Sequence, residues 1–146
     1  NSNRKNFLID IGGEIIVNGT KHGAPWVIGI QDPSSHQNKS IMEILETDFL
    51  AVATSGEYRN QKINDSGEML SHTFNPIMEQ SILDKSYSVT VASEESSMSA
   101  DAWATALNVL GPEKGIDLAN DNAVAVMYIM HKENILIKSK FWDYSD

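Results

Sequence analysis

The chain has 146 residues, of which 41% are hydrophobic and 21% charged, which is ordinary for a single globular domain. The formal charge of −9 argues against a protein that follows nucleic-acid phosphates with a basic surface, although bound Mg²⁺ can reverse the local field for one nucleotide. The absence of cysteine excludes disulfides, thiolate zinc sites and a cysteine nucleophile, and no run of residues approaches the length of a membrane span.

Short apolar stretches separated by turn residues predict a succession of strands over the first part of the chain. These strands are expected at Asn6–Ile11, Glu14–Val17, Trp26–Gln31, Ile41–Glu46, Leu50–Ala53, Tyr58–Ile63 and Glu68–Phe74. Asn18-Gly19 is a strong hairpin signal, and Asn64–Gly67 is another. A glycine inside a predicted strand, Gly29, indicates a bulge or a close approach by another backbone or a ligand. Residues 32–39 are predicted to be a loop, and 76–85 irregular.

The last part of the chain predicts a strand, two consecutive helices and a closing antiparallel pair of strands. The expected bounds are Tyr87–Ala92, Ser96–Leu110, Glu113–Asn120, Ala123–Met130 and Ile135–Lys140. Ser96 and the serines after it can cap the first helix, because each carries an acceptor for unpaired N–H groups. Gly111 ends that helix, and Pro112 suits the start of the next.

Strands and helices that do not alternate regularly indicate an α+β fold. We expect one domain over residues 1–146, with a mostly antiparallel sheet and the two consecutive helices near its C-terminal end. Two helices can cover only part of so many strands. One face of the sheet is therefore expected to lean on a partner subunit or on a further segment of chain.

The first helix carries a candidate metal site. Asp101 and Thr105 are four residues apart, so their side chains share one helix face, and the alanines around them leave room for a ligand. A carboxylate and a hydroxyl in this arrangement are a plausible half-site for Mg²⁺, which takes oxygen ligands. The structural interpretation stays open, because an early Asp also complements the helix dipole and a helical Thr often faces solvent.

Two turns are candidates for nucleotide contacts. Gly12 and Gly13 lie between two strands, where paired glycines let a backbone approach a ligand and present N–H groups to it. Thr54-Ser55-Gly56 follows another strand and offers two hydroxyls to a phosphate or ribose. A plain glycine bulge and an ordinary turn are the alternative interpretations.

A histidine stands at the end of a predicted strand. His72 lies within Ser71–Pro76, and histidine is the side chain best suited to proton transfer near neutral pH. A structural role is the alternative for a lone histidine.

Several segments follow one another in an order far more specific than any one of them: Asp10–Glu14, Trp26–Ile30, Ala53–Tyr58, Ser71–Pro76, Ser88–Val91 and Ala100–Leu107. Together they closely resemble the ApbE family, the FAD:protein FMN transferases once described as thiamine-biosynthesis lipoproteins. The resemblance runs from about Asn6 to Ile129 and covers roughly the C-terminal half of a usual member. Since the chain starts at Asn1 and not at Met, a truncated chain is expected.

The resemblance implies a T-fold-like core and a specific chemistry. The family uses FAD as substrate with Mg²⁺, attaches FMN to a threonine or serine hydroxyl of an acceptor protein, and releases AMP. By match to its motifs, Asp101 and Thr105 are expected to bind the metal, and His72 to act as the catalytic base. The flavin-nucleotide contacts are expected at Gly12, Gly13, Glu14, Thr54, Ser55 and Gly56.

The sequence departs from the family pattern at a few positions. Asn75 stands where the family commonly has Asp, Met78-Glu79 replaces a Thr-Gly-type turn, and Trp103 replaces an aliphatic residue in the helix motif. The changes at Asn75 and at Met78-Glu79 put the contact between the Pro76–Asp84 loop and the substrate in doubt.

Alternatives to a transferase remain at this point: a non-catalytic flavin- or nucleotide-binding module, and an FAD pyrophosphatase in which water replaces the protein hydroxyl. The missing N-terminal part of the family is expected to weaken catalysis by this chain alone and to leave apolar surface that a homodimer covers. No nucleic-acid partner is expected. The resemblance further implies a periplasmic or lipid-anchored bacterial protein.

Overall fold

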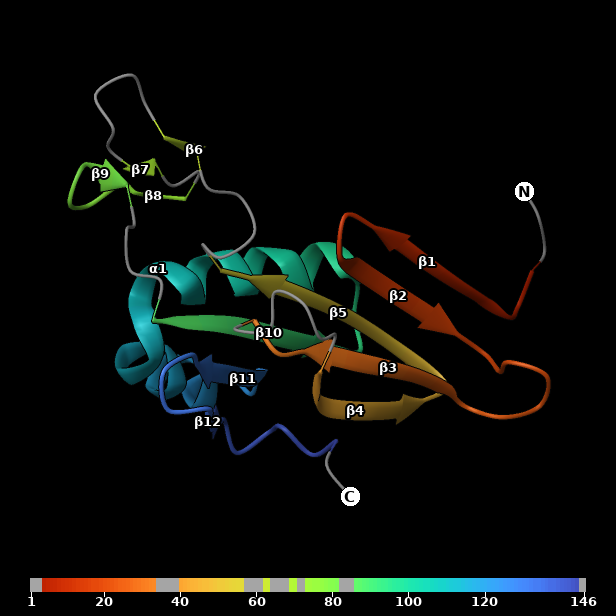
Figure 1. The fold of residues 1–146 in the computed structure, drawn as a ribbon. Helices are drawn as coiled ribbons and strands as arrows, with labels where there is room; N and C mark the ends of the chain where they lie inside the picture. Colours follow the sequence, from red (N-terminus) through yellow and green to blue (C-terminus); the bar gives the residue numbers. More distant parts are fainter. Residues whose placement is uncertain are drawn as a thin grey trace.

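A six-stranded antiparallel sheet forms the centre of the protein (Figure 1). The computed structural model describes residues 4–33, 40–56, 62–63, 69–70, 73–81 and 86–144. In spatial order the strands of the sheet are β1 (Phe7–Ile11), β2 (Glu14–Asn18), β5 (Phe49–Ser55), β10 (Tyr87–Ser93), β11 (Ala125–Met130) and β12 (Ile135–Lys138). All neighbouring strands are antiparallel, which confirms the predicted α+β class.

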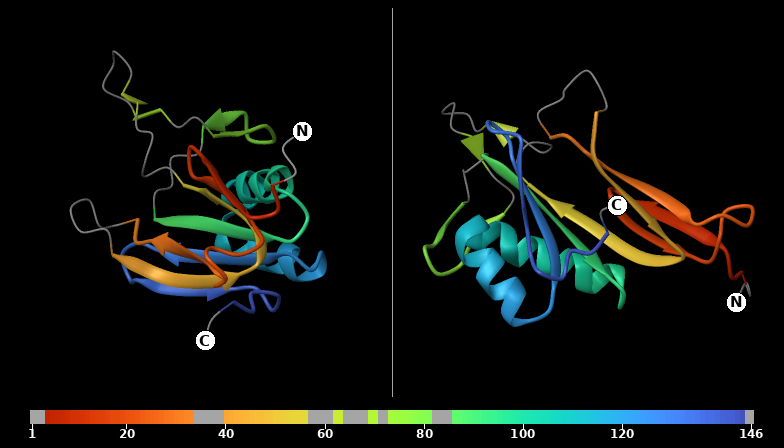
Figure 2. Two further views of the ribbon diagram at one scale, coloured as in Figure 1. Left: turned by 90° about the vertical axis from the view of Figure 1, so that its right-hand side faces the viewer. Right: turned by 90° about the horizontal axis from the view of Figure 1, so that it is seen from below.

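The sheet lies between two other layers. The helix α1 (Ser97–Asp121) packs on one face, and a hairpin of β3 (Trp26–Gln31) and β4 (Ile41–Thr47) packs on the other (Figure 2). The prediction that one face lacks cover within this chain is wrong over the middle of the sheet. There the hairpin residues Ile28 and Leu45 are buried with Val52 of β5.

The central strands alternate between the two layers. In β5, Ala51 and Ala53 belong to the core under the helix, whereas Leu50 and Val52 belong to the core under the hairpin. This is the two-residue period of a strand, with both faces buried. The small side chains of Ala51 and Ala53 share this core with three buried alanines of the helix, so helix and sheet pack closely: Ala100, Ala104 and Ala119.

The chain returns from the hairpin layer to the sheet in a very short connection. One residue, Asp48, separates β4 from β5, and the hydroxyl of Thr47 bonds both the N–H and the carbonyl of Phe49 across it. The predicted hairpin at Asn18-Gly19 is wrong. Gly19 does turn with φ +68°, but β2 pairs with β1 and β5 while β3 pairs with β4.

The two predicted helices form the one element α1, with a break at the predicted place. Gly111 has φ 78° and ψ 171°, which is not helical, and Pro112 follows it inside the element. The side chain of Ser96 caps the start by accepting a hydrogen bond from the N–H of Ser99 at 3.1 Å. This confirms the predicted serine cap.

The segment between β5 and β10 holds short strands only, as far as the structure describes it. β6 (Lys62–Ile63) pairs with β7 (Met69–Leu70), and β8 (Phe74–Asn75) pairs with β9 (Gln80–Ser81). The prediction that residues 76–85 are irregular is corrected by the β8–β9 hairpin as far as residue 81, and residues 82–85 lie outside the described residues. The turn of this hairpin forms because the side-chain oxygen of Asn75 accepts bonds from the N–H groups of Ile77 and Met78, an Asx turn that local sequence had not revealed.

Candidate functional site

A cleft of about 280 Å³ opens between the hairpin layer and the sheet. We call it the glycine cleft. Its lining comes from the β1–β2 turn, β3 and β5, and consists of Asp10, Gly13, Ile15, Ile28, Gly29, Ile30, Gln31, Val52 and Thr54. Gly13 and Thr54, predicted from separate motifs, thus lie in one cavity.

The β1–β2 turn is built on its two glycines. Gly12 and Gly13 have φ values of 71° and 109°, a region that side chains disfavour, and Ile11 pairs directly with Glu14 across them. The N–H of Gly13 donates to Asp10 Oδ1 at 3.0 Å. Of the two N–H groups predicted to face a nucleotide, one therefore already has a partner in the chain. Glu14 is half-buried at the start of β2.

Thr54 has a fixed hydroxyl on the floor of the cleft. Its Oγ1 lies 2.9 Å from Oγ1 of Thr90, which is fully buried in the neighbouring strand β10. Because the Thr90 hydroxyl has no access to solvent, its hydrogen bond with Thr54 restricts the rotation of the Thr54 side chain. Ser55 and Gly56 follow, both half-buried.

The β3 wall of the cleft was missed by the site prediction. The signal for it was Gly29 inside a predicted strand. A Cβ at Gly29 would lie 3.0 Å from Cδ1 of Ile41, so this glycine lets the two hairpin strands pack closely beside the cleft. The sequence indicated a close approach at this position but not that the approach borders the same cavity as Gly13.

The predicted metal ligands lie in the other layer. Asp101 and Thr105 are both exposed on α1, one turn apart on the same face, and neither lines the glycine cleft. A carboxylate and a hydroxyl are oxygen ligands of the kind that Mg²⁺ takes, and water or phosphate would have to supply the others. Within the described residues, no cluster of three or more His, Asp or Glu side chains could hold a metal ion. The predicted base His72 lies outside the described residues.

The architecture is that of the flavin transferases. It superimposes on the apo form of the flavinyl transferase ApbE from Pseudomonas stutzeri with a TM-score of 0.73 and 37% identity, over 95% of this chain and 43% of that one. An ApbE protein from Thermotoga maritima gives a TM-score of 0.78 at 25% identity, over 97% of this chain and 45% of that one.

The chain belongs to the ApbE family, whose model matches residues 1–129. A FAD:protein FMN transferase of Vibrio cholerae is 40% identical to it over 131 residues, which is 89% of this chain and 38% of the relative. The chain therefore spans well under half the length of the curated relatives it matches. The predicted family is confirmed by these comparisons.

Proposed function

We propose that the protein containing this chain transfers FMN from FAD to a serine or threonine hydroxyl of an acceptor protein. In this reaction the hydroxyl oxygen forms a bond to the phosphorus on the FMN side, and the P–O bond of the pyrophosphate breaks. AMP, which contains the other phosphate, is the leaving group. The similarity to the Vibrio cholerae transferase over 89% of the chain carries the proposal. The glycine cleft, which joins two of the predicted nucleotide motifs, supports it.

The flavin nucleotide is proposed to contact both turns at the cleft. Gly12 and Gly13 bring the backbone close because no side chain stands in the way, and the Thr54 hydroxyl is fixed by Thr90 to meet a polar group of the ligand. Glu14, Ser55 and Gly56 are proposed as further contacts. The role of Gly13 is close approach more than N–H donation, since Asp10 already takes its N–H.

Asp101 and Thr105 are proposed to hold Mg²⁺. A pyrophosphate is itself negatively charged, and this chain adds a formal charge of −9, so a cation between them would offset their repulsion. When bound, Mg²⁺ supplies the charge neutralisation that phosphoryl transfer requires. His72 is proposed to accept the proton of the acceptor hydroxyl, an assignment that rests on its motif alone.

The decisive experiment uses the full-length protein with FAD, Mg²⁺ and an acceptor protein. Mass spectrometry is expected to show the acceptor gaining one FMN, with equimolar AMP. A variant acceptor with alanine at the modified position is the control. FMN released free in solution, at the same rate with and without acceptor, would instead establish a pyrophosphatase. Binding of FAD without either product would establish a non-catalytic flavin module.

Self-association of this chain is also proposed. The edge strand β1 exposes Leu8, Ile9 and Ile11, at 43%, 46% and 71% of their surface. An exposed apolar edge favours pairing with another strand, and in a twofold dimer the same edge of each copy pairs with the other.

A periplasmic or lipid-anchored location remains a proposal from the family resemblance. No helix among the described residues is long and apolar enough to cross a membrane.

A further inference from the structure

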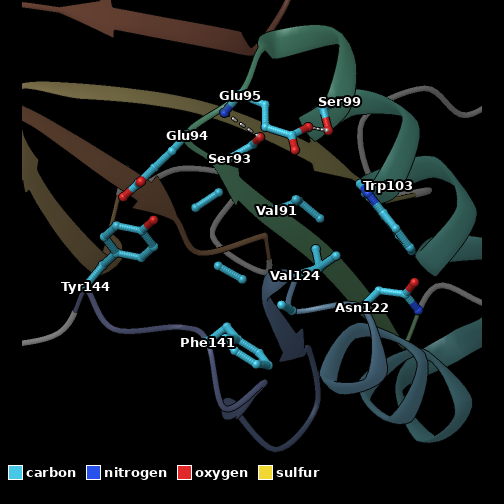
Figure 3. Close-up of a pocket in the computed structure, with 13 residues that line it drawn as sticks. Val91, Ser93, Glu94, Glu95, Ser99, Trp103, Asn122, Val124, Phe141 and Tyr144 are labelled. Carbon is cyan, nitrogen blue, oxygen red and sulfur yellow. Dashed lines mark hydrogen bonds between the residues drawn. The ribbon is translucent and has the colours of Figure 1, made fainter.

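A second cavity, of about 330 Å³, lies at the N-terminal end of α1 (Figure 3). We call it the aromatic pocket. The β10–α1 connection, the helix itself, the α1–β11 turn and the chain after β12 all contribute to it. The residues that carry the argument are Glu94, Glu95, Ser99, Trp103, Phe141 and Tyr144.

The aromatic pocket is separate from the proposed catalytic machinery. It shares no lining residue with the glycine cleft. Ser99 and Trp103 line it from one flank of the helix. Asp101 follows Ser99 by two positions, which is a rotation of about 200° at 3.6 residues per turn, so the proposed metal ligands lie on the opposite flank. A ligand in this pocket would therefore occupy neither the glycine cleft nor the proposed metal half-site.

Aromatic rings form its walls. Figure 3 shows Trp103, Phe141 and Tyr144 arranged around an apolar floor that includes Val91 and Val124. Phe141 and Tyr144 lie beyond residues 1–129, the part that the family model matches. Two of the three rings therefore come from outside the segment on which the family assignment rests.

The charge of the pocket is negative. Glu94 and Glu95 both line it, and Lys, Arg and His are absent from the described lining residues. Glu95 is held in place, because its N–H donates to Ser93 Oγ at 3.1 Å and its Oε2 accepts from Ser99 Oγ at 3.0 Å. Burial raises the pKa of Tyr144, and the nearby charges of Glu94 and Asp143 raise it further.

From these features we infer that the aromatic pocket binds a small organic ammonium ion. Aromatic faces attract a cation through the ring quadrupole, and carboxylates at the same cavity add direct charge attraction. Phosphates and other anions are repelled by the same carboxylates. A cavity of about 330 Å³ is at the small end of ligand pockets, which suits a compact ion and not an extended peptide.

The test compares choline with 3,3-dimethylbutan-1-ol, which has the same shape with carbon in place of the charged nitrogen. Binding to the intact chain is followed through the NMR signal of the Trp103 indole N–H. Choline is expected to shift this signal and to bind at least tenfold more tightly than the neutral alcohol. Equal binding of the two, or no shift with either, overturns the inference.

Two variants assign the binding to the pocket. Glu94→Gln is expected to weaken choline binding by about two- to fivefold, within the range of an exposed charge. Glu113→Gln, an exposed change on the second segment of α1, is the matched control and is expected to leave it unchanged. Equal affinity in wild type and Glu94→Gln contradicts the inference, and because Glu94 is exposed, this variant is expected to fold normally.

A lysine side chain of a protein partner offers related chemistry. A third titration uses Nα-acetyl-lysine amide, whose side-chain ammonium is free, as a model of such a lysine. We expect this compound to bind more weakly than choline, because a primary ammonium is more strongly hydrated and meets the rings less fully. Tighter binding of the lysine compound overturns the small-molecule assignment and points to a docking site for a protein.

Discussion

The hydroxyl of Tyr87 donates a hydrogen bond of 2.9 Å to the backbone oxygen of Asn108. In a continuous helix this oxygen would accept from the N–H four residues further on, but that residue is Pro112, which has none. The sheet therefore supplies the missing donor. The Tyr128 hydroxyl lies 2.8 and 3.2 Å from the oxygens of Leu107 and Gly111 and shares its one proton between them. The break in α1 is thus anchored to β10 and β11.

Tyr87→Phe is expected to destabilise the protein by about 1–3 kcal/mol, because it leaves a buried carbonyl without a donor. Urea denaturation followed by circular dichroism measures this. Tyr144→Phe is the control, since no hydrogen bond of the Tyr144 hydroxyl is found among the described residues, and it is expected to change stability by less than about 0.5 kcal/mol. If both changes lower the free energy of unfolding equally, the hydrogen bond from Tyr87 to Asn108 makes no specific contribution to stability.

Gly115→Ala is expected to be among the most damaging small substitutions in the helix. A Cβ there would lie 2.0 Å from the hydroxyl oxygen of Tyr128, which is fully buried and cannot move aside freely. Overpacking of this kind costs about 1–3 kcal/mol. Lys114→Ala, on the exposed side, is the control for helix propensity. Thermal melting that is unchanged by Gly115→Ala would contradict the packing of α1 against β11.

The break in α1 at Gly111 could be predicted from the sequence because its causes are local. Gly111 and Pro112 act on their own neighbours, as does the serine cap, so reading the chain residue by residue is enough. The pairing of β2 with β5 is different, because Ile15 and Val52 are far apart in the chain and nothing local selects one partner strand over another. The hairpin that covers the sheet was missed for the same reason.

The candidate site likewise has a part that local sequence predicts and a part that depends on how distant strands pair. The glycine turn and the Thr54 strand end were visible as motifs, but their meeting in one cleft depends on the sheet order. A signal against the expected bare sheet face was present. In β5, Leu50, Ala51, Val52 and Ala53 are all apolar, which indicates a strand buried on both faces and not one half exposed to solvent.

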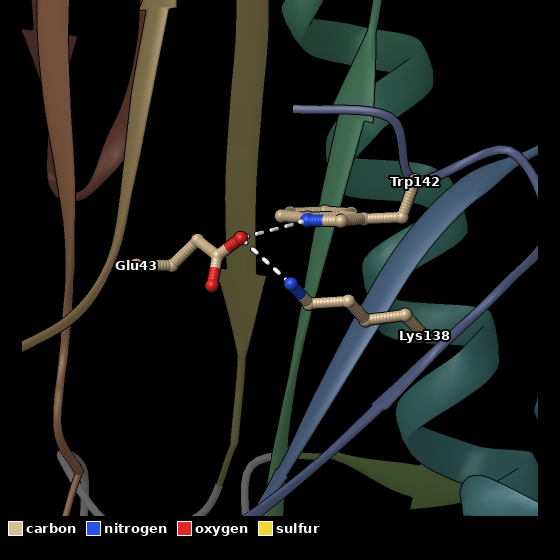
Figure 4. Close-up of polar contacts among 3 residues, drawn as sticks. All are labelled: Glu43, Lys138 and Trp142. Atoms are coloured by element: carbon tan, nitrogen blue, oxygen red, sulfur yellow. Dashed lines mark hydrogen bonds and ion pairs between the residues drawn. The ribbon is translucent and has the colours of Figure 1, made fainter. Parts of the chain in front are cut away.

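Lys138→Met is expected to loosen the hairpin from the sheet. Lys138 Nζ lies 2.7 Å from Glu43 Oε1, and the Trp142 indole N–H points at the same oxygen at 3.4 Å (Figure 4). The Glu43 side chain is only 9% exposed, so loss of the ammonium leaves its charge partly buried at a cost of about 1–3 kcal/mol. Lys140 is exposed, and Lys140→Met is the control. The effect is measured as the rate of amide hydrogen exchange in β3 and β4.

Faster exchange is expected in Lys138→Met throughout the hairpin, with α1 unaffected. If exchange accelerates equally in all elements, the ion pair stabilises the whole fold and does not specifically fasten the hairpin.

Asp101→Asn in the full-length protein is expected to abolish most Mg²⁺-dependent FMN transfer while leaving the melting temperature unchanged, because Asp101 is exposed. The amide keeps the shape but loses the negative charge that a hard cation prefers. Asp117→Asn, also exposed on α1, is the control. Raising Mg²⁺ is expected to restore part of the activity of the Asp101 variant. Wild-type activity at limiting Mg²⁺ would remove Asp101 from the proposed metal site.

The isolated 146-residue chain is expected to form a twofold dimer through β1, measured by light scattering. Ile9→Lys puts a charge on this edge and is expected to give a monomer, because a lysine opposite its own copy is repelled. Val27→Lys, on the exposed side of β3 at 58%, leaves β1 intact and is expected to stay dimeric. A monomeric wild-type chain would contradict self-association, whereas dissociation by Val27→Lys alone would move the interface to the outer face of the hairpin.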